Sequence, residues 1–108
     1  MKLLVRDRIL LYDSAKGETG EKDFRVRTDV SLIKAEIRGS GTLVIQGTTD
    51  IPDEDGHAYY FTIGGISVTD YSKHVSLTNG MFNVECSGLC HIKTSLDSAC
   101  DVYLTLIG

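Results

Sequence analysis

Apolar and polar residues alternate along most of the chain, and this alternation predicts its secondary structure. The segment 32–38 (LIKAEIR) is the clearest example, because its apolar residues share one parity and its charged residues share the other. Alternation with a period of two indicates strands that bury one face. Strands are therefore expected in 2–12, 24–31, 32–38, 42–47, 58–63, 81–88, 89–95 and 101–108, with one or two short strands in 64–80.

Turn residues separate these segments roughly every eight to twelve positions, and no stretch has the pattern of a helix of useful length. This combination predicts an all-β fold, namely an antiparallel β-sandwich or jelly-roll-like domain with about eight strands. Gly39, Ser40 and Gly41 are expected to form a tight turn that joins 32–38 to 42–47 as a hairpin. At 108 residues, the chain is expected to form a single domain.

The first 28 residues combine an expected strand with a polar segment. The strand in 2–12 is expected near a sheet edge, because Asp7 interrupts its apolar parity. The segment 13–23 is polar and contains glycine, which indicates a mobile loop, or an arm that becomes ordered only on contact with a neighbour. An exposed edge strand can pair with another chain. Deletion of 1–23 is therefore expected to leave a folded domain that no longer assembles.

Charge is unevenly distributed along the sequence. Residues 1–38 contain nine Lys and Arg against seven Asp and Glu, a net +2, whereas residues 39–108 contain two against eight, a net −6, which together give −4. Harmless surface variation is the simpler interpretation, and contact between the basic end of one copy and the acidic face of the next is the sharper one. The small number of basic residues after position 38 argues against binding to nucleic acid. The residues predicted to contact a neighbour are Leu4, Arg6, Arg8, Lys16, Lys22 and Tyr60.

The apolar run at the N-terminus does not resemble a targeting segment. It is broken at Arg6, short of the about seven apolar residues that a signal peptide needs. No stretch approaches the about twenty apolar residues of a membrane span. The sequence therefore predicts a soluble protein made in the cytoplasm, with no membrane partner.

Three cysteines and a histidine lie close together in the segment CSGLCH, 86–91, and at Cys100. On a strand, Cys86 and Cys90 would be roughly 13 Å apart unless Gly88 forms a bend, too far to share a metal ion or to form a disulfide with each other. Their parity matches that of the apolar neighbours, which favours buried structural thiols. A metal site and a disulfide are the alternatives, and a disulfide would join Cys100 to Cys90 across a hairpin or to another chain.

The histidines give no indication of catalysis. His57, His74 and His91 are scattered over loop and strand positions, and spacing alone pairs none of them with a nucleophile and an acid. No catalytic residue and no cofactor are predicted, and the chain is not expected to be an enzyme.

The acidic stretch DIPDEDGH, 50–57, is the best candidate for binding a cation. Oxygen ligands close together on a turn suit Ca²⁺, but the bidentate glutamate expected about six residues after the glycine of a calcium loop is missing. A solvated acidic turn is the simpler interpretation, so no metal is predicted. The candidate ligands are Asp50, Asp53 and Asp55.

The aromatic residues allow a second kind of function. Alternation places Tyr59 and Phe61 on one face, where they are expected to pack in the core, and leaves Tyr60 more exposed. Tyr60 beside Tyr71 would offer a surface on which a sugar ring can stack. A carbohydrate-binding module is therefore an alternative function.

A set of turn glycines and strand residues carries a family resemblance. The residues that match are Gly39, Gly41, Gly47, Asp50, Gly80, Phe82, Val84, Gly88 and Leu89. Through them, residues 29–108 resemble the small β-sandwich domains of virion proteins from tailed bacteriophages. The arginine-rich strand that usually follows Gly-Leu in these domains is replaced here by Cys90, His91 and Lys93.

The resemblance implies a non-enzymatic structural protein of the virion, made in the host cytoplasm. Its expected role is that of a capsid decoration or cement protein that acts through homo-oligomer and lattice contacts. Tail, head–tail and fibre-associated roles are alternatives within the same family. The expected partners are further copies of the chain and other virion proteins, such as the major capsid protein or tail components, and a host surface glycan is a further candidate.

Overall fold

The computed structural model describes residues 6–55 and 57–108, so the predicted contact at Leu4 lies outside the described residues. The described residues form eleven strands and one short 3₁₀ helix, η1 (Ser14–Lys16). The strands are β1 (Arg6–Tyr12), β2 (Gly20–Arg25), β3 (Leu32–Arg38), β4 (Leu43–Thr48), β5 (Phe61–Ile63), β6 (Gly65–Ser67), β7 (Lys73–His74), β8 (Ser76–Leu77), β9 (Gly80–Glu85), β10 (His91–Leu96) and β11 (Asp101–Ile107).

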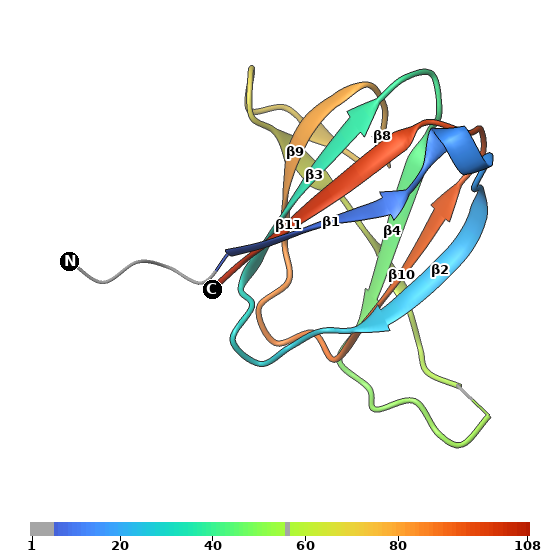
Figure 1. Ribbon diagram of the computed structural model, residues 1–108. Coiled ribbons are helices and arrows are strands. Elements are labelled where there is room, and N and C mark those ends of the chain that lie inside the picture. The colour runs from blue at the N-terminus through green and yellow to red at the C-terminus, as the bar shows by residue number, and fades with distance from the viewer. Residues whose placement is uncertain (1–5, 56) are drawn as a thin grey trace.

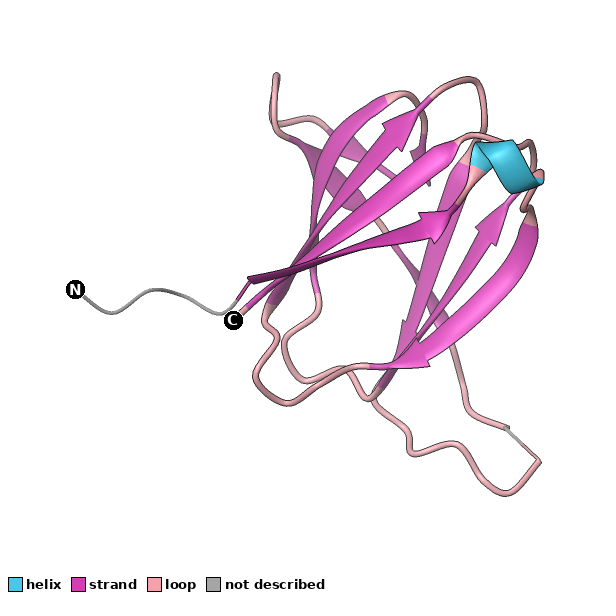
Figure 2. Cartoon of the chain, in the orientation of Figure 1, coloured by secondary structure: helices cyan, strands magenta, loops and turns pink. Residues whose placement is uncertain are grey.

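The strands form two antiparallel sheets that pack face to face as a sandwich (Figures 1 and 2). The six-stranded sheet has the order β1-β11-β3-β9-β6-β7, and the five-stranded sheet contains β2-β10-β4-β5, with β8 also paired to β4. The predicted all-β sandwich is confirmed. More than the expected eight strands are present among the described residues, because 64–80 contains three short strands, β6, β7 and β8, where one or two were expected.

The core lies between the two sheets and is built from the buried parity of the alternating segments. In β3, Ile33, Ala35 and Ile37 are each at most 1% exposed. Tyr12 is fully buried, and its hydroxyl donates to the backbone oxygen of Gly20 at 2.7 Å, so its polar atom is not left without a partner. The other large core residues are Leu43, Ile45, Leu77, Phe82, Val84, Ile92, Leu96, Val102 and Leu104.

The expected hairpin between 32–38 and 42–47 is wrong, because the two strands lie in different sheets. β3 pairs with β11 and β9, whereas β4 pairs with β10, β5 and β8. The glycine-rich link therefore crosses from one sheet to the other. Gly41 is required there, since a Cβ at this position would lie 2.4 Å from the backbone oxygen of Ser98.

The segment 13–23 contains η1 and the first four residues of β2, so the prediction of a loop over its whole length is wrong. Asp13 accepts a hydrogen bond from the backbone N–H of Ala15 at 2.9 Å and caps η1, while the backbone N–H of Ser14 donates to Asp101 Oδ1 at 2.9 Å. The end of the segment belongs to β2, which pairs with β10 along its whole length. Backbone pairing orders this polar stretch, although it has little apolar surface to bury.

The chain passes from the five-stranded to the six-stranded sheet between β5 and β6, at Gly64 and Gly65. A Cβ on Gly64 would lie 2.6 Å from the backbone oxygen of His74, and a Cβ on Gly65 would lie 2.9 Å from Phe82 Cβ. Glycine is therefore required at this corner. Because β6 pairs with β9 only as far as Asn83, the corner leaves a groove beside the end of β9.

Candidate interaction surfaces

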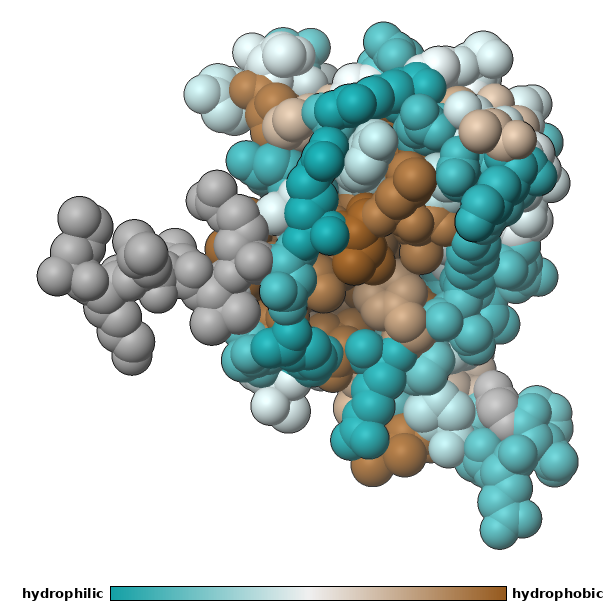
Figure 3. Space-filling model, viewed as in Figure 1, coloured by the Kyte–Doolittle hydropathy of each residue, from teal (hydrophilic) through white to brown (hydrophobic). Residues whose placement is uncertain are grey.

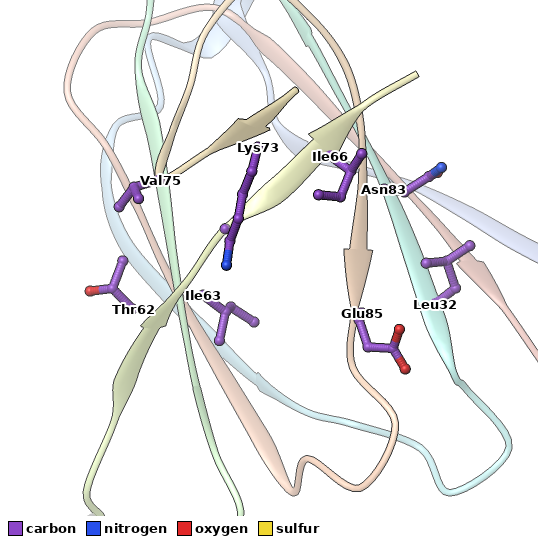
Figure 4. A pocket seen from close by; sticks show the side chains of 9 residues that line it. Leu32, Thr62, Ile63, Ile66, Lys73, Val75, Asn83 and Glu85 are labelled. Carbon is purple, nitrogen blue, oxygen red and sulfur yellow. The ribbon is translucent and has the colours of Figure 1, made fainter. Parts of the chain in front are cut away.

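The groove beside β9, called the corner groove below, has a volume of about 470 Å³ (Figure 4). Lys73 of β7 and Glu85 of β9 bring opposite charges to it from two different strands. Asn83 also lines the groove, and its buried Oδ1 has no hydrogen-bond partner among the described residues. Val75 is 59% exposed, so the groove presents apolar surface to solvent. The apolar lining residues are Leu32, Ile63, Ile66 and Val75.

Two open sheet edges form a second candidate surface. Among the described strands β1 pairs only with β11, and β2 pairs only with β10, so each has one open edge, and both edges lie on the same side of the sandwich (Figure 1). Apolar surface is visible between them (Figure 3), where Phe24 and Leu106 are half-buried. On β1 itself, Ile9 and Leu10 are 40% and 43% exposed. The strand expected near a sheet edge is therefore at an edge.

Side-chain bonds connect these two edges near both ends of β1. Arg27 bonds to Asp7 at 2.5 Å and to Asp29 at 2.7 Å. Near the other end, Lys22 Nζ donates to the backbone oxygen of Leu11 at 2.5 Å and also pairs with Glu18, whose pKa is lowered by that hydrogen bond. Lys22 was predicted to contact a neighbouring copy, but its ammonium group is engaged within the chain.

Arg8 belongs to a group on the outer face of the six-stranded sheet, called the arginine–tyrosine cluster below. Its guanidinium group bonds to Glu36 at 3.3 Å and lies 3.9 Å from the centroid of the Tyr103 ring. Arg38 bonds to the same carboxylate at 2.9 Å and lies 4.6 Å from the same ring. Both arginine side chains remain about half exposed. Side chains already fixed in this way lose little conformational freedom on binding, which suits the cluster to contact with another protein.

The remaining predicted contact residues do not lie together with Arg8. Lys16 is exposed on η1. Tyr60 is half-buried, and Lys93 Nζ of the five-stranded sheet lies 4.5 Å from the centroid of its ring. The side chain of Arg6 lies outside the described part of the chain, although its backbone begins β1. Arg8, Lys16 and Tyr60 therefore do not form one surface.

The structure reverses the prediction for the aromatic strand. Tyr59 and Phe61 are 70% and 64% exposed, with ring centroids 4.9 Å apart, whereas Tyr60 is half-buried. The reason is that β5 begins only at Phe61 and is three residues long, so both rings lie beyond the core. Tyr71 is 80% exposed in the loop between β6 and β7, at the opposite end of the sandwich from the start of β5. The expected pair of Tyr60 and Tyr71 is not formed.

The acidic loop brings together Asp53, Asp55 and His57, all exposed, with ligand atoms within 4.8 Å of one another, while the predicted ligand Asp50 lies outside this group. The Asp53 carboxylate accepts hydrogen bonds from the backbone N–H groups of Asp55 at 3.0 Å and His57 at 2.8 Å. A carboxylate used in this way closes a turn. The cluster is therefore explained by the structure of the loop.

A serine and an aspartate of the loop between β6 and β7 come together with a histidine of β7, although sequence spacing did not pair them. Ser72 Oγ donates to Asp70 Oδ1 at 2.6 Å and lies 2.7 Å from His74 Nε2. Because the serine proton points to the carboxylate, His74 Nε2 donates to Ser72 and does not accept its proton. This order is the reverse of the one that activates a serine nucleophile. The hydrogen bonds from Ser72 lower the pKa of Asp70 and stabilise the loop.

The three cysteines are free thiols, so the disulfide between Cys90 and Cys100, which the sequence left open as an alternative to buried thiols, is absent. The backbone N–H of Cys90 donates to the oxygen of Thr48, at the end of β4, whereas Cys100 packs beside Gly41, before the start of β4. The length of β4 separates the two cysteines by about 17 Å, too far for a disulfide. The chain bends at Gly88 between β9 and β10 as predicted, and its φ of 82° is the left-handed conformation that favours glycine.

The corner groove was missed by sequence reasoning. The signal that could have found it is the Gly64-Gly65 pair inside a segment that otherwise has a strand pattern, because glycines within strands mark bends and close backbone approach.

Among the described residues, no helix has the length and apolarity needed to cross a membrane.

These features define an all-β sandwich with open edges and a groove at a sheet corner. No protein-family model matches the sequence, and no curated protein matches it. Among solved structures, the fold is similar to the crystal structure of SPBc2 prophage-derived protein YomS, with a TM-score of 0.75 and 16% sequence identity. The match covers 100% of this chain and 97% of that chain. At this identity the likeness establishes the fold alone.

Proposed function

We propose that this chain is a non-enzymatic structural protein of a bacteriophage and that it acts as a capsid decoration or cement protein. The observation that carries the proposal is the open edge of β1, an ordered strand with one side unpaired. The similarity in fold to a prophage-derived protein supports a phage context. In this role the chain is a component of the virion, and its partners are other copies of itself and the major capsid protein.

In this proposal, the backbone groups along the open edge of β1 pair with an extended segment of a neighbouring virion protein. The arginine–tyrosine cluster supplies directed contacts to acidic or carbonyl oxygens next to that edge. Leu10 shares the parity of Arg8 and is 43% exposed, so it adds apolar area to the same contact. Binding thus depends on buried surface and needs no catalytic group.

The experiment is sedimentation of the purified chain with capsids that lack it. The chain should co-sediment with the capsids, and Leu10→Lys should weaken binding about tenfold or more, since burial of a leucine side chain contributes about 1.5–3 kcal/mol. Tyr71→Lys is the matched control, because Tyr71 is also an exposed apolar residue but lies in the loop before β7, at the opposite edge of the six-stranded sheet from β1. No co-sedimentation with capsids, combined with binding to tails or fibres, would replace the capsid role with one of those alternatives.

One observation favours a second candidate, a glycan-binding surface. Tyr59 and Phe61 present two exposed rings 4.9 Å apart, next to the acidic loop. Aromatic rings of this kind can stack on sugars. Binding on a glycan array that is lost in Tyr59→Ala and kept in Tyr71→Ala would support this function, and absence of binding by the wild-type chain would remove it.

A further inference from the structure

The corner groove is an apolar site with a single acidic residue on one wall. Ile66 and Val75 are 38% and 59% exposed there, which is unusual for aliphatic side chains next to a core (Figure 4). Glu85 ends β9 and is exposed, and none of the described cations forms an ion pair with it. A matching partner therefore carries aliphatic side chains and a cation placed near Glu85.

The sequence immediately before β1 has this chemistry. Residues 1–5 read MKLLV, which places the cation of Lys2 next to three consecutive aliphatic residues. An orientation that puts Lys2 beside Glu85 keeps it away from Lys73, which lies on the opposite wall of the groove. The segment and the groove are therefore complementary in charge and in apolar character.

The strand register shows whether residues 1–5 can reach the corner groove of their own chain or only that of a second copy. Arg6 pairs with Ile107, Ile107 with Leu32, and Leu32 with Glu85, so these residues form one cross-strand row. Leu32, at the near wall of the groove, is two strand spacings or about 10 Å from β1, and Glu85 is three spacings or about 14 Å away. The aliphatic wall at Ile66 on β6 lies a further spacing of about 5 Å beyond Glu85. Five extended residues span at most about 17 Å. Leu3 is three residues from Arg6 and therefore reaches at most about 10 Å. The aliphatic residues of the segment could reach Leu32 in their own chain but not Ile66 or Val75, so only the groove of a second copy allows contact with all of its aliphatic walls.

We propose that residues 1–5 of one copy bind the corner groove of a second copy, with Leu3, Leu4 and Val5 against its aliphatic walls and Lys2 beside Glu85. This inference rests on the proposed function, because it names a second copy as the partner through which a decoration protein associates on a lattice. The described fold begins at Arg6, so the segment can be removed without removing any described strand.

The first test measures the mass of the chain in solution by light scattering over a range of concentrations. The full chain should associate, whereas a variant lacking residues 2–5 and the groove variant Val75→Asp should each remain monomeric. Ile51→Asp is the matched control and should associate like the wild type, because Ile51 is an exposed aliphatic residue that does not line the groove. A full chain that stays monomeric at every concentration overturns the inference, as does association of the truncated variant equal to that of the full chain.

The second test asks for the predicted pairing of Lys2 with Glu85. Glu85→Lys should weaken self-association about tenfold, as loss of a close charge pair and its replacement by repulsion imply. Lys2→Glu should weaken it similarly, and the double variant should recover most of the wild-type association. A double variant that self-associates more weakly than both single variants would contradict the pairing of Lys2 with Glu85.

A mixing experiment separates exchange between copies from other modes of association. The truncated chain offers a groove without the segment, and Val75→Asp offers the segment without a usable groove, so their mixture should form a complex that neither forms alone. Capsid binding is measured separately. If the truncated monomer still co-sediments with capsids, only this inference fails, whereas association through the groove without capsid binding means that only the proposed function fails.

Discussion

At the scale of single residues, Cys86, one of the cysteines considered as a metal ligand, is part of the core. Cys86 is 1% exposed, and burial, followed by the nearby charge of Glu85, raises the pKa of its thiol. The thiolate is the form that binds metals and reacts, so a raised pKa leaves little of it at neutral pH. Cys90 is only half-buried, because the chain turns at Gly88 between the two sheets before β10 begins.

Glycine is needed at two positions for different reasons: a Cβ would clash with neighbouring atoms at Gly41, whereas the backbone is in the left-handed conformation at Gly17. Gly41→Ala places a Cβ 2.4 Å from the Ser98 oxygen and 2.7 Å from Cys100 Sγ, so we expect the free energy of unfolding to fall by about 3 kcal/mol. Gly17→Ala meets no atom within 4 Å but requires a φ of 65°, so its expected cost is about 1 kcal/mol. Chemical denaturation measures both, and an equal or larger loss in Gly17→Ala would contradict the crossing geometry.

At the scale of elements, the alternating segments were predictable, but their neighbours were not. The pattern of 32–38 matches β3 residue for residue, because alternation reports directly which side chains are buried. It gives no information on pairing, so β3 and β4 were wrongly joined across Gly39 and Gly41. The strand expected in 24–31 was placed too late, because β2 spans Gly20–Arg25 and residues 26–31 form no strand. This edge strand is ordered by backbone hydrogen bonds to β10, which the hydropathy of its side chains does not indicate.

The link between η1 and β11 is expected to depend on pH. The backbone N–H of Ser14 donates to Asp101, and this hydrogen bond is the main cause of the lowered pKa of that carboxyl. Because the pKa is lower in the folded state, the bond contributes stability above the ordinary value of 3.8, and this contribution is lost as the pH falls through the lowered folded value. Amide exchange at Ser14, followed by NMR, should therefore accelerate on acidification before the core strands open.

The control for this prediction is Asp101→Asn, which removes the titrating group. In this variant, the backbone amide of Ser14 should exchange faster than in the wild type at neutral pH. After correction for the intrinsic pH dependence of amide exchange, its exchange rate should show no further change on acidification. If the exchange rate of Ser14 in the wild type had the same pH dependence as in Asp101→Asn, the hydrogen bond from Ser14 to Asp101 would not hold η1 in place.

At the scale of the whole molecule, the candidate surfaces depend on how the two sheets are joined. The corner groove combines Leu32, Ile63, Lys73 and Glu85, which come from four strands, and their proximity follows from the crossing at Gly64 and Gly65. Parity assigned Tyr59 and Phe61 to the buried side, yet no core extends as far as these rings. The open edge of β1 was predictable because Asp7 marks it in the sequence itself.

The boundary between the folded domain and any assembly segment gives the last prediction. Deletion of 1–23 removes β1, most of β2 and Tyr12, which is fully buried and bonds to Gly20, so this variant should fail to fold. Loss of one aromatic core side chain alone costs about 3–5 kcal/mol, a large part of the stability of a domain of this size. Deletion of 2–5 removes no described strand and should leave the unfolding midpoint nearly unchanged. Thermal unfolding followed by circular dichroism compares the two variants, and a cooperative transition in the longer deletion would contradict the placement of β1 and β2 in the sandwich.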